Sequence, residues 1–201
     1  MPELALALLA AFGLVAFVGR MLVQLRRTGS TGFKGISGAV GSAEWLGGAL
    51  LVLGWGLAGL GPVLDLADVL GRIEALDGET GQAAGAGLAA GGIVTTAYSQ
   101  LAMGDQWRIG VDATERTALV TEGPFSVVRN PIYTGMIPFF AGLALLVPNV
   151  VTVASALLVL ASLELQTRLV EEPYLIEVHG DEYAAYAARV GRFLPRLGRL
   201  R

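Results

Sequence analysis

The sequence contains no cysteine and a single histidine, His179. The lack of cysteine excludes disulfide frameworks, thiolate metal sites and a cysteine nucleophile. One histidine cannot form a histidine metal cluster, so we expect no metal site. Charge is also scarce, because only 15% of the residues are charged while 54% are hydrophobic, and the mean hydropathy is +0.62. These values are typical of membrane proteins rather than soluble domains, and we expect no nucleic-acid partner.

Five segments reach or approach the roughly 20 helical residues that are needed to cross a bilayer. They are Leu4–Leu25, Ala43–Leu60, Gln82–Met103, Ile132–Val147 and Asn149–Val170. The fourth is short and contains Pro138, so we expect it to tilt, kink or cross only in part. The sequence therefore predicts an all-α, polytopic membrane bundle of about five transmembrane helices.

Basic residues gather on one side of these predicted spans. Most of the arginines follow the first, third and fifth segments, whereas the loop after the second segment holds Arg72 among five acidic residues. Loops rich in Lys and Arg stay in the cytoplasm. We therefore predict an integral membrane protein with its N-terminus outside and its C-terminus in the cytoplasm.

Small residues dominate the second and third segments, which predicts close helix packing rather than catalysis there. Between these segments, Pro62–Leu76 has apolar residues at helical spacing with acidic residues between them. That pattern predicts an amphipathic helix lying in the outer interface.

A polar loop, GPFSVVRNPIYTG at 123–135, leads directly into the fourth segment. Asn130 is a suitable N-cap, and Pro131 fits the first helical position, where no N–H is needed. Free amides at the helix start, together with the Arg129 guanidinium, favour the binding of an anionic group. The alternative is a capped helix entry with an interfacial arginine.

Acidic and basic residues alternate at the end of the fifth segment. Glu164, Arg168 and Glu171 share one helix face by their spacing, which favours a polar cavity at this end, although an interfacial ion pair gives the same pattern. Pro173 disfavours a helical conformation at Glu172, so we expect a helix break there. A last helix then places Tyr183 and Tyr186 on one side and arginines on the other.

Three motifs in this order resemble one family: GDQWRIGV, TEGPFSVVRNPIYTG and EEPYLIEVHGDEYAAYAARVGRFLP. They look like the integral-membrane methyltransferases that include isoprenylcysteine carboxyl methyltransferase and the phospholipid N-methyltransferases. The resemblance covers about 104–195. It implies that S-adenosyl-L-methionine binds at the cytoplasmic face. The cofactor-binding residues it implies are Gly123, Pro124, Val128, Arg129, Asn130, Pro131, Tyr133, Gly135, Glu171, Glu172, Tyr183 and Tyr186.

The resemblance also implies roles for the charged groups. Arg129 and the helix start suit the carboxylate of the cofactor, while Glu171 or Glu172 suits its ammonium and sulfonium. Glu171 and Arg168 are the candidate catalytic residues, with Arg168 positioning a carboxylate acceptor. The family usually has histidine where this chain has Asn130, which cannot titrate. On this basis we expect residues 104–201 to form the methyltransferase-like half and residues 1–103 to supply packing and substrate access.

Two other functions remain open. The membrane sterol and steroid reductases share a related C-terminal half with an asparagine in the corresponding motif, and they use NADPH, whose phosphates could be bound by Arg108, Arg116 and Arg129. A membrane scaffold or small transporter without enzymatic activity is the third possibility. For a methyltransferase, the lipid-like acceptor could be an isoprenylcysteine, a phospholipid amine or a quinone-like headgroup.

Overall fold

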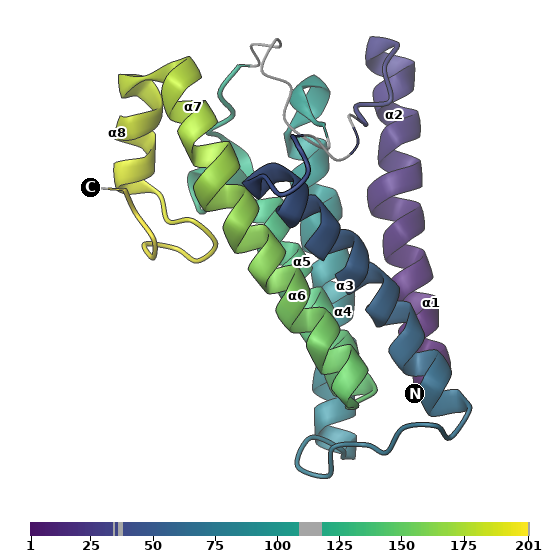
Figure 1. The fold of residues 1–201 in the computed structure, drawn as a ribbon. Coiled ribbons are helices and arrows are strands. Elements are labelled where there is room, and N and C mark those ends of the chain that lie inside the picture. The colour runs from purple at the N-terminus through teal and green to yellow at the C-terminus, as the bar shows by residue number, and fades with distance from the viewer. Residues whose placement is uncertain (34, 36–37, 109–117, 201) are drawn as a thin grey trace.

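The computed structural model describes residues 1–33, 35, 38–108 and 118–200, and these residues form helices and connecting loops without a strand (Figure 1). Arg116 and the end of the GDQWRIGV motif lie outside the described residues. The elements in chain order are α1 (Pro2–Phe12), η1 (Gly13–Gly19), α2 (Arg20–Thr28), α3 (Ala43–Leu66), α4 (Glu79–Ala102), η2 (Gly104–Gln106), η3 (Gly123–Ser126), α5 (Pro131–Leu146), α6 (Val150–Gln166), η4 (Thr167–Glu171), α7 (Glu172–His179) and α8 (Asp181–Arg189). The predicted all-α membrane bundle is confirmed.

Three of the described helices are long and apolar enough to cross a membrane: Pro2–Thr28, Ala43–Leu66 and Val150–His179. The first of them runs without interruption through α1, η1 and α2. Helix α5 is a shorter apolar helix of 16 residues that contains Pro138, in agreement with the short fourth segment expected from the sequence. Helix α4 has 24 residues but is not among the apolar spans, because Gly, Ala and polar residues make up most of its length.

Glycine carbonyls on α3 accept hydrogen bonds from small polar side chains on α6. The Oγ atoms of Ser155 and Ser162 donate to the carbonyl oxygens of Gly54 and Gly47, at 2.7 Å in each case. Because both pairs of residues are seven positions apart, the antiparallel helices stay in register over two turns. Close approach of backbones at small residues is the usual way in which helices associate in lipid, and the packing predicted for the second segment is confirmed.

Helices α4 and α5 also approach each other through glycines. A Cβ atom added at Gly92 would lie 2.6 Å from the carbonyl oxygen of Gly135, and one at Gly85 would lie 2.7 Å from that of Gly142. The Oγ1 of Thr96 donates to the Ile132 carbonyl at 3.3 Å nearby. This contact fixes the start of α5, where the polar loop enters the helix.

Replacing Gly92 with alanine is therefore expected to destabilise the protein. The new methyl group meets the α5 backbone, so the overpacking cost of about 1–3 kcal/mol exceeds the gain of about 1 kcal/mol in helix propensity. Thermal unfolding in detergent measures the difference. Gly91→Ala is the matched control because nothing lies within 4 Å of a Cβ there. Equal melting temperatures for the two variants would contradict the packing described.

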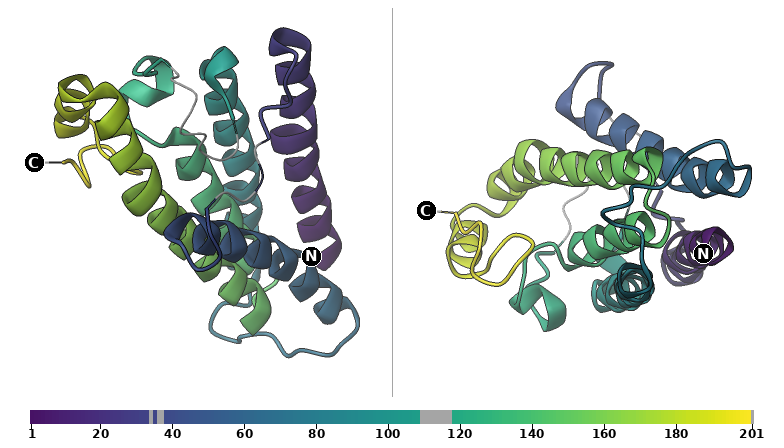
Figure 2. Two further views of the ribbon diagram at one scale, coloured as in Figure 1. Left: turned by 45° about the horizontal axis from the view of Figure 1, so that its top comes forward. Right: turned by 90° about the horizontal axis from the view of Figure 1, so that it is seen from below.

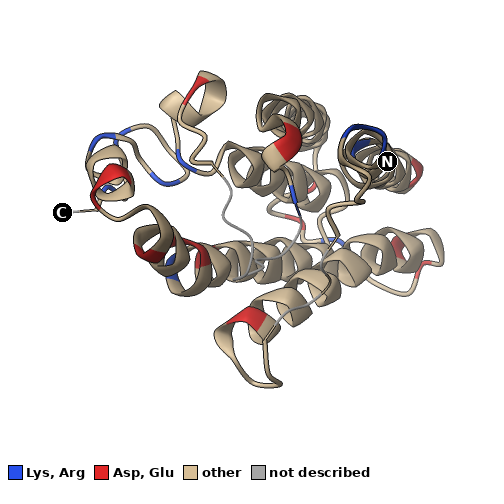
Figure 3. Cartoon of the chain, turned by 90° about the horizontal axis from the view of Figure 1, so that it is seen from above, with Lys and Arg blue, Asp and Glu red and all other residues tan. Residues whose placement is uncertain are grey.

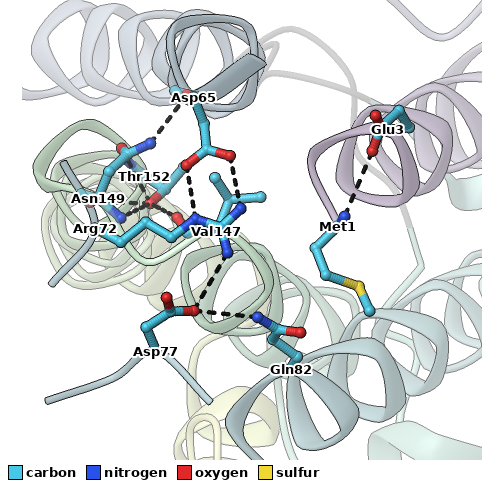
Figure 4. A network of polar contacts seen from close by, with 10 residues as sticks. Met1, Glu3, Asp65, Arg72, Asp77, Gln82, Val147, Asn149 and Thr152 are labelled. Atoms are coloured by element: carbon cyan, nitrogen blue, oxygen red, sulfur yellow. Dashed lines mark hydrogen bonds and ion pairs between the residues drawn. The ribbon is translucent and has the colours of Figure 1, made fainter. Parts of the chain in front are cut away.

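The predicted amphipathic helix over Pro62–Leu76 is wrong. Helix α3 instead continues through Pro62 to Leu66, and 67–78 forms turns and irregular structure. The reason is the Arg72 guanidinium, which donates to both Asp65 carboxylate oxygens at 2.9 and 2.8 Å and to Asp77 at 3.3 Å (Figure 4). The loop is also bound to the connection between α5 and α6, because the Ile73 N–H donates to the Pro148 carbonyl at 2.6 Å.

The predicted helix break at Glu172 is wrong as well. Helix α6 continues through η4, one wide π-helical turn, into α7. The Glu172 N–H bonds the carbonyl of Thr167, five residues back. Pro173 follows within the first turn of α7 and has no N–H to donate. The wider turn thus keeps the helix continuous, and π turns of this kind are frequent at functional sites.

Helices α7 and α8 and the start of α5 lie at one end of the bundle, and the α3–α4 loop lies at the other (Figures 1 and 2). Viewed from the end that holds α7 and α8, basic positions lie on the segment after α8 and on the first helix (Figure 3). Most of the described functional residues expected from the sequence belong to α7, α8, the start of α5 and the segments next to them.

Candidate active site

A cavity of about 250 Å³ lies where α5 begins. Among the described residues, its apolar wall comes mainly from the first half of the chain and α5, and includes Phe12, Ala16, Phe17, Leu51 and Met136. Its polar and aromatic wall comes mainly from the second half, and includes Trp107, Arg108, Phe125, Arg129, Asn130, Tyr133, Glu171, Glu172, Tyr174, Tyr183 and Tyr186. One cavity therefore offers a polar region and an apolar region side by side.

The loop before α5 is held by the chain that follows α8. The N–H groups of Arg129 and Asn130 donate to the carbonyls of Gly191 and Arg192 at 2.8 and 3.1 Å, and Val128 pairs with Gly191 as an isolated parallel bridge. Gly123 opens the loop at φ +58°, a left-handed conformation that favours glycine. These contacts fix the approach to the first turn of α5.

Asn130 occupies the N-cap position of α5, with Pro131 in the first turn, but the predicted side-chain cap is wrong. Its side chain makes no capping hydrogen bond. Its backbone is instead fixed from both sides, because its N–H is bound by Arg192 and its carbonyl accepts from the Thr134 Oγ1 at 3.1 Å. The first amides of α5 are thus left without a side-chain cap beside the cavity.

Arg129 lies in a buried ion cluster with Glu172 and Arg192. Its Nη2 donates to Glu172 Oε1 at 2.5 Å, and Arg192 donates to both Glu172 oxygens at 2.8 Å. The Arg129 Nη1 donates to the carbonyls of Ala187 and Val190 at 3.0 and 2.6 Å. Hydrogen bonding to Glu172 raises the pKa of Arg192. Both carboxylate oxygens of Glu172 are therefore occupied, and its side chain connects α7 to the loop before α5 and to the segment after α8.

Arg129 keeps one donor outside this cluster. Its Nε is buried and has no hydrogen-bond partner among the described residues, while the side chain lines the cavity. An unpaired buried N–H is costly, so this atom indicates that an acceptor group can be taken up next to it.

Glu171 has a different environment from Glu172. Its Oε1 accepts a short hydrogen bond from the Tyr133 hydroxyl, and both side chains line the cavity. The two adjacent glutamates face different partners because neighbouring helical residues point about 100° apart, with Glu171 the last residue of η4 and Glu172 the first of α7. Glu171 is therefore the carboxylate that faces the cavity with a phenol as its partner rather than a pair of arginines.

Tyr183 and Tyr186 pack together on α8 as predicted for the last helix, with ring centroids 6.1 Å apart. The Tyr186 hydroxyl donates to the Phe125 carbonyl at 2.5 Å, which connects α8 to the loop before α5. Burial raises the pKa of Tyr183 and of Tyr186 to about 12. Both side chains therefore remain neutral phenols at physiological pH.

The cavity brings together most of the predicted site residues, but five of them lie elsewhere. Gly123, Pro124 and Val128 belong to the loop behind the cavity and do not line it. Gly135 packs against Thr96 and Gly92 of α4, so it serves helix packing. The predicted stack of Glu164, Arg168 and Glu171 forms only in part, because Glu171 instead binds the Tyr133 hydroxyl at the cavity. Arg168 pairs with Glu164 at the exposed surface.

Sequence reasoning missed a further group at the cavity, the contact of Arg20 with Trp107. The Arg20 guanidinium lies 4.7 Å from the Trp107 ring centroid, donates to the Gly104 carbonyl and donates to the Gln100 carbonyl at 3.3 Å. A helix in the first half of the chain thereby binds the C-terminal end of α4. Trp107 is only 2% exposed. Its place in the GDQWRIGV motif was the one sequence signal for this contact.

The fold and the site together define the class of protein. It is an integral-membrane helical bundle that encloses a cavity with a polar and an apolar wall. A family model described as phospholipid methyltransferase matches residues 80–182, about half of the chain. The chain belongs to the phospholipid methyltransferase family. The matched residues run from α4 to the start of α8 and include Arg129, Tyr133 and Glu171.

A curated relative matches part of the chain, and a solved structure shares the fold. A stretch of 77 residues, 38% of the chain, is 35% identical to the protein-S-isoprenylcysteine O-methyltransferase of Schizosaccharomyces pombe and spans 33% of that protein. The fold is similar to the solved structure of a eukaryotic intramembrane Ras methyltransferase, isoprenylcysteine carboxyl methyltransferase, with a TM-score of 0.53 and 16% identity over 100% of this chain and 99% of that one. The resemblance predicted from the three motifs is confirmed.

Proposed function

We propose that this protein is an S-adenosyl-L-methionine-dependent methyltransferase that acts on a lipid-like acceptor at the cytoplasmic interface of the membrane. The observation that carries the proposal is the cavity of about 250 Å³, which joins Glu171, Tyr133 and the start of α5 to an apolar wall in the membrane bundle. Membership of the phospholipid methyltransferase family supports methyl transfer as the reaction.

The polar wall fits a zwitterionic sulfonium nucleotide. The uncapped first amides of α5 and the unpaired Arg129 Nε suit the carboxylate of S-adenosyl-L-methionine, since helix N-termini attract anions. Glu171 suits the ammonium and the sulfonium. Trp107, Phe125 and Tyr174 offer aromatic surfaces for the purine. Glu172 is excluded from direct cofactor contact in this proposal because Arg129 and Arg192 occupy its oxygens.

When bound, the cofactor supplies an electrophilic methyl group on a positively charged sulfur. The protein groups need only orient the acceptor in line with that methyl group and keep water out. Glu171, fixed by the Tyr133 hydroxyl, holds negative charge next to the position of the sulfonium. A carboxylate acceptor needs no general base, whereas an amine acceptor must be presented in its neutral form, and Glu171, bound by the Tyr133 hydroxyl at the cavity, is the carboxylate proposed to assist.

The apolar wall supports an acceptor with a hydrocarbon chain. Phe12, Phe17 and Leu51 come from helices that cross or approach the membrane, so a lipid chain can lie along them while its headgroup reaches the polar residues. The name of the yeast relative points to an isoprenylcysteine carboxylate, and that of the family points to a phospholipid amine. The arginines after the first and last spans support an orientation with this end in the cytoplasm and the N-terminus outside.

Addition of S-adenosyl-L-methionine, or of its demethylated product, to the purified protein is expected to raise the melting temperature by about 5 °C at saturating ligand. NADPH at the same concentration is expected to leave the melting temperature unchanged, because the amino groups of Arg129 are already bound to Glu172 and to backbone carbonyls. A thermal-shift assay measures both. Stabilisation by NADPH alone would instead establish the reductase alternative, and no response to any of these ligands would favour the scaffold or transporter.

A further inference from the structure

The chain after α8 forms a closed turn that is bonded to the ion cluster. The Arg192 N–H donates to the Leu197 carbonyl at 2.7 Å, and the Leu197 N–H donates to the Leu194 carbonyl at 3.1 Å. A Cβ atom at Gly191 would lie only 2.0 Å from the Leu194 carbonyl oxygen, so the turn closes tightly. The Arg129 Nη2 also donates to the Gly198 carbonyl at 3.0 Å. The turn is therefore a fixed part of the structure rather than a loose tail.

This fixed turn presents apolar and cationic side chains together on its outer side. Leu194 is 55% exposed and Leu197 is 61% exposed, and Arg196 and Arg199 are exposed beside them. The stretch 189–200 contains four arginines and no acidic residue. Leucines held at the surface among arginines are typical of segments that enter the headgroup region of a membrane.

The turn also lies at the depth where an interface is expected. The Thr134 Oγ1 donates to the Phe193 carbonyl at 2.8 Å, and the rings of Tyr133 and Phe193 are 6.4 Å apart, so the turn is next to the first turn of apolar helix α5. Helix α8 begins farther toward the end of the molecule and leads down to the turn (Figure 1). With nine residues, α8 spans about 13 Å, which separates its first residues from the level of the turn.

We propose that Phe193–Arg199 is a membrane-surface anchor whose leucines enter the acyl region and whose arginines bind anionic lipid headgroups. An acidic partner protein could also attract the arginines, but it would leave the leucines unexplained. The lipid surface accounts for both kinds of side chain and for the position beside α5. Because Arg192, directly before the anchor, binds Glu172 of α7, the anchor holds the polar wall of the cavity at headgroup level.

The absence of cysteine from the chain allows a direct test on the protein in liposomes. Leu197→Cys, labelled with an environment-sensitive fluorophore, is expected to be quenched by lipids brominated on the acyl chains and shielded from iodide. Glu182→Cys, at the exposed start of α8, is the matched control and is expected to be quenched by iodide. Leu194→Cys provides a second, independent position in the turn.

The electrostatic part is tested in the same assay. In bilayers containing phosphatidylglycerol, replacing Arg196 and Arg199 with glutamine is expected to reduce the bromolipid quenching at position 197 about threefold, with little change in pure phosphatidylcholine. Equal iodide quenching at positions 197 and 182 would overturn the anchor. Bromolipid quenching that does not depend on anionic lipid would overturn the headgroup contacts. The assay reads depth rather than methyl transfer, so its failure is distinguishable from failure of the proposed function.

Discussion

Glu171→Gln is expected to weaken the binding of S-adenosyl-L-methionine by about 1–3 kcal/mol, which corresponds to roughly a 5- to 150-fold rise in Kd. The substitution keeps the shape of the side chain and an oxygen for the Tyr133 hydroxyl. It removes the negative charge that the proposal places beside the sulfonium and the ammonium. Isothermal titration of the purified protein measures the change in Kd directly.

The matched control for this change is Glu164→Gln. Glu164 lies two turns earlier on the same continuous helix and pairs with Arg168 at the exposed surface, so its loss is expected to leave the cofactor affinity unchanged. The melting temperature without ligand should be similar for the two variants. Identical Kd values for Glu171→Gln and the unmodified protein would remove Glu171 from the site.

Glu172→Gln is expected to act on stability instead. The change leaves the Arg129 and Arg192 guanidinium groups buried without their shared counter-ion. Removal of one member of a buried ion cluster typically costs about 3–5 kcal/mol, so the melting temperature should fall by roughly 10 °C. Thermal unfolding in detergent, followed by circular dichroism, measures the fall.

Glu177→Gln is the control on the same helix, since Glu177 is exposed and its replacement is expected to change little. The two adjacent glutamates are thus separable by experiment, because one variant should lose affinity and the other stability. A Glu172→Gln protein that melts normally but fails to bind the cofactor would contradict the division of roles described.

The local elements were predictable from the sequence, whereas the partners of the charged groups were not. Pro131 and the apolar run after it were sufficient to place the start of α5. The sequence also identified Arg129, but it could not reveal that the carbonyls of Ala187, Val190 and Gly198 bind its guanidinium, because these contacts join residues about 60 to 70 positions apart. A pattern in one segment carries no information about which distant backbone it meets.

Two errors along the helices have separate physical causes. The spacing rule for Glu164, Arg168 and Glu171 assumes 100° per residue, and the π turn at Thr167–Glu171 changes that angle. The acidic residues after Pro62 fitted an amphipathic helix, but Arg72 binds both Asp65 at the end of α3 and Asp77 in the loop that follows. In both places a single tertiary contact or a local change of helix geometry overrides a regular pattern.

The cavity is enclosed by residues from more of the chain than the family model matches, and this limits what can be transplanted into another protein. Residues 80–182, which the family model matches, contain most of the polar residues of the cavity but not all of the residues that enclose it. Phe12 and Leu51 precede that stretch, and the carbonyls that hold Arg129 in place follow it. A graft of residues 80–182 alone would transfer most of the polar site residues without most of the apolar wall and without the carbonyls that hold Arg129. Exchanging the helices before residue 80 would instead change the shape of the acceptor that fits against the same polar residues.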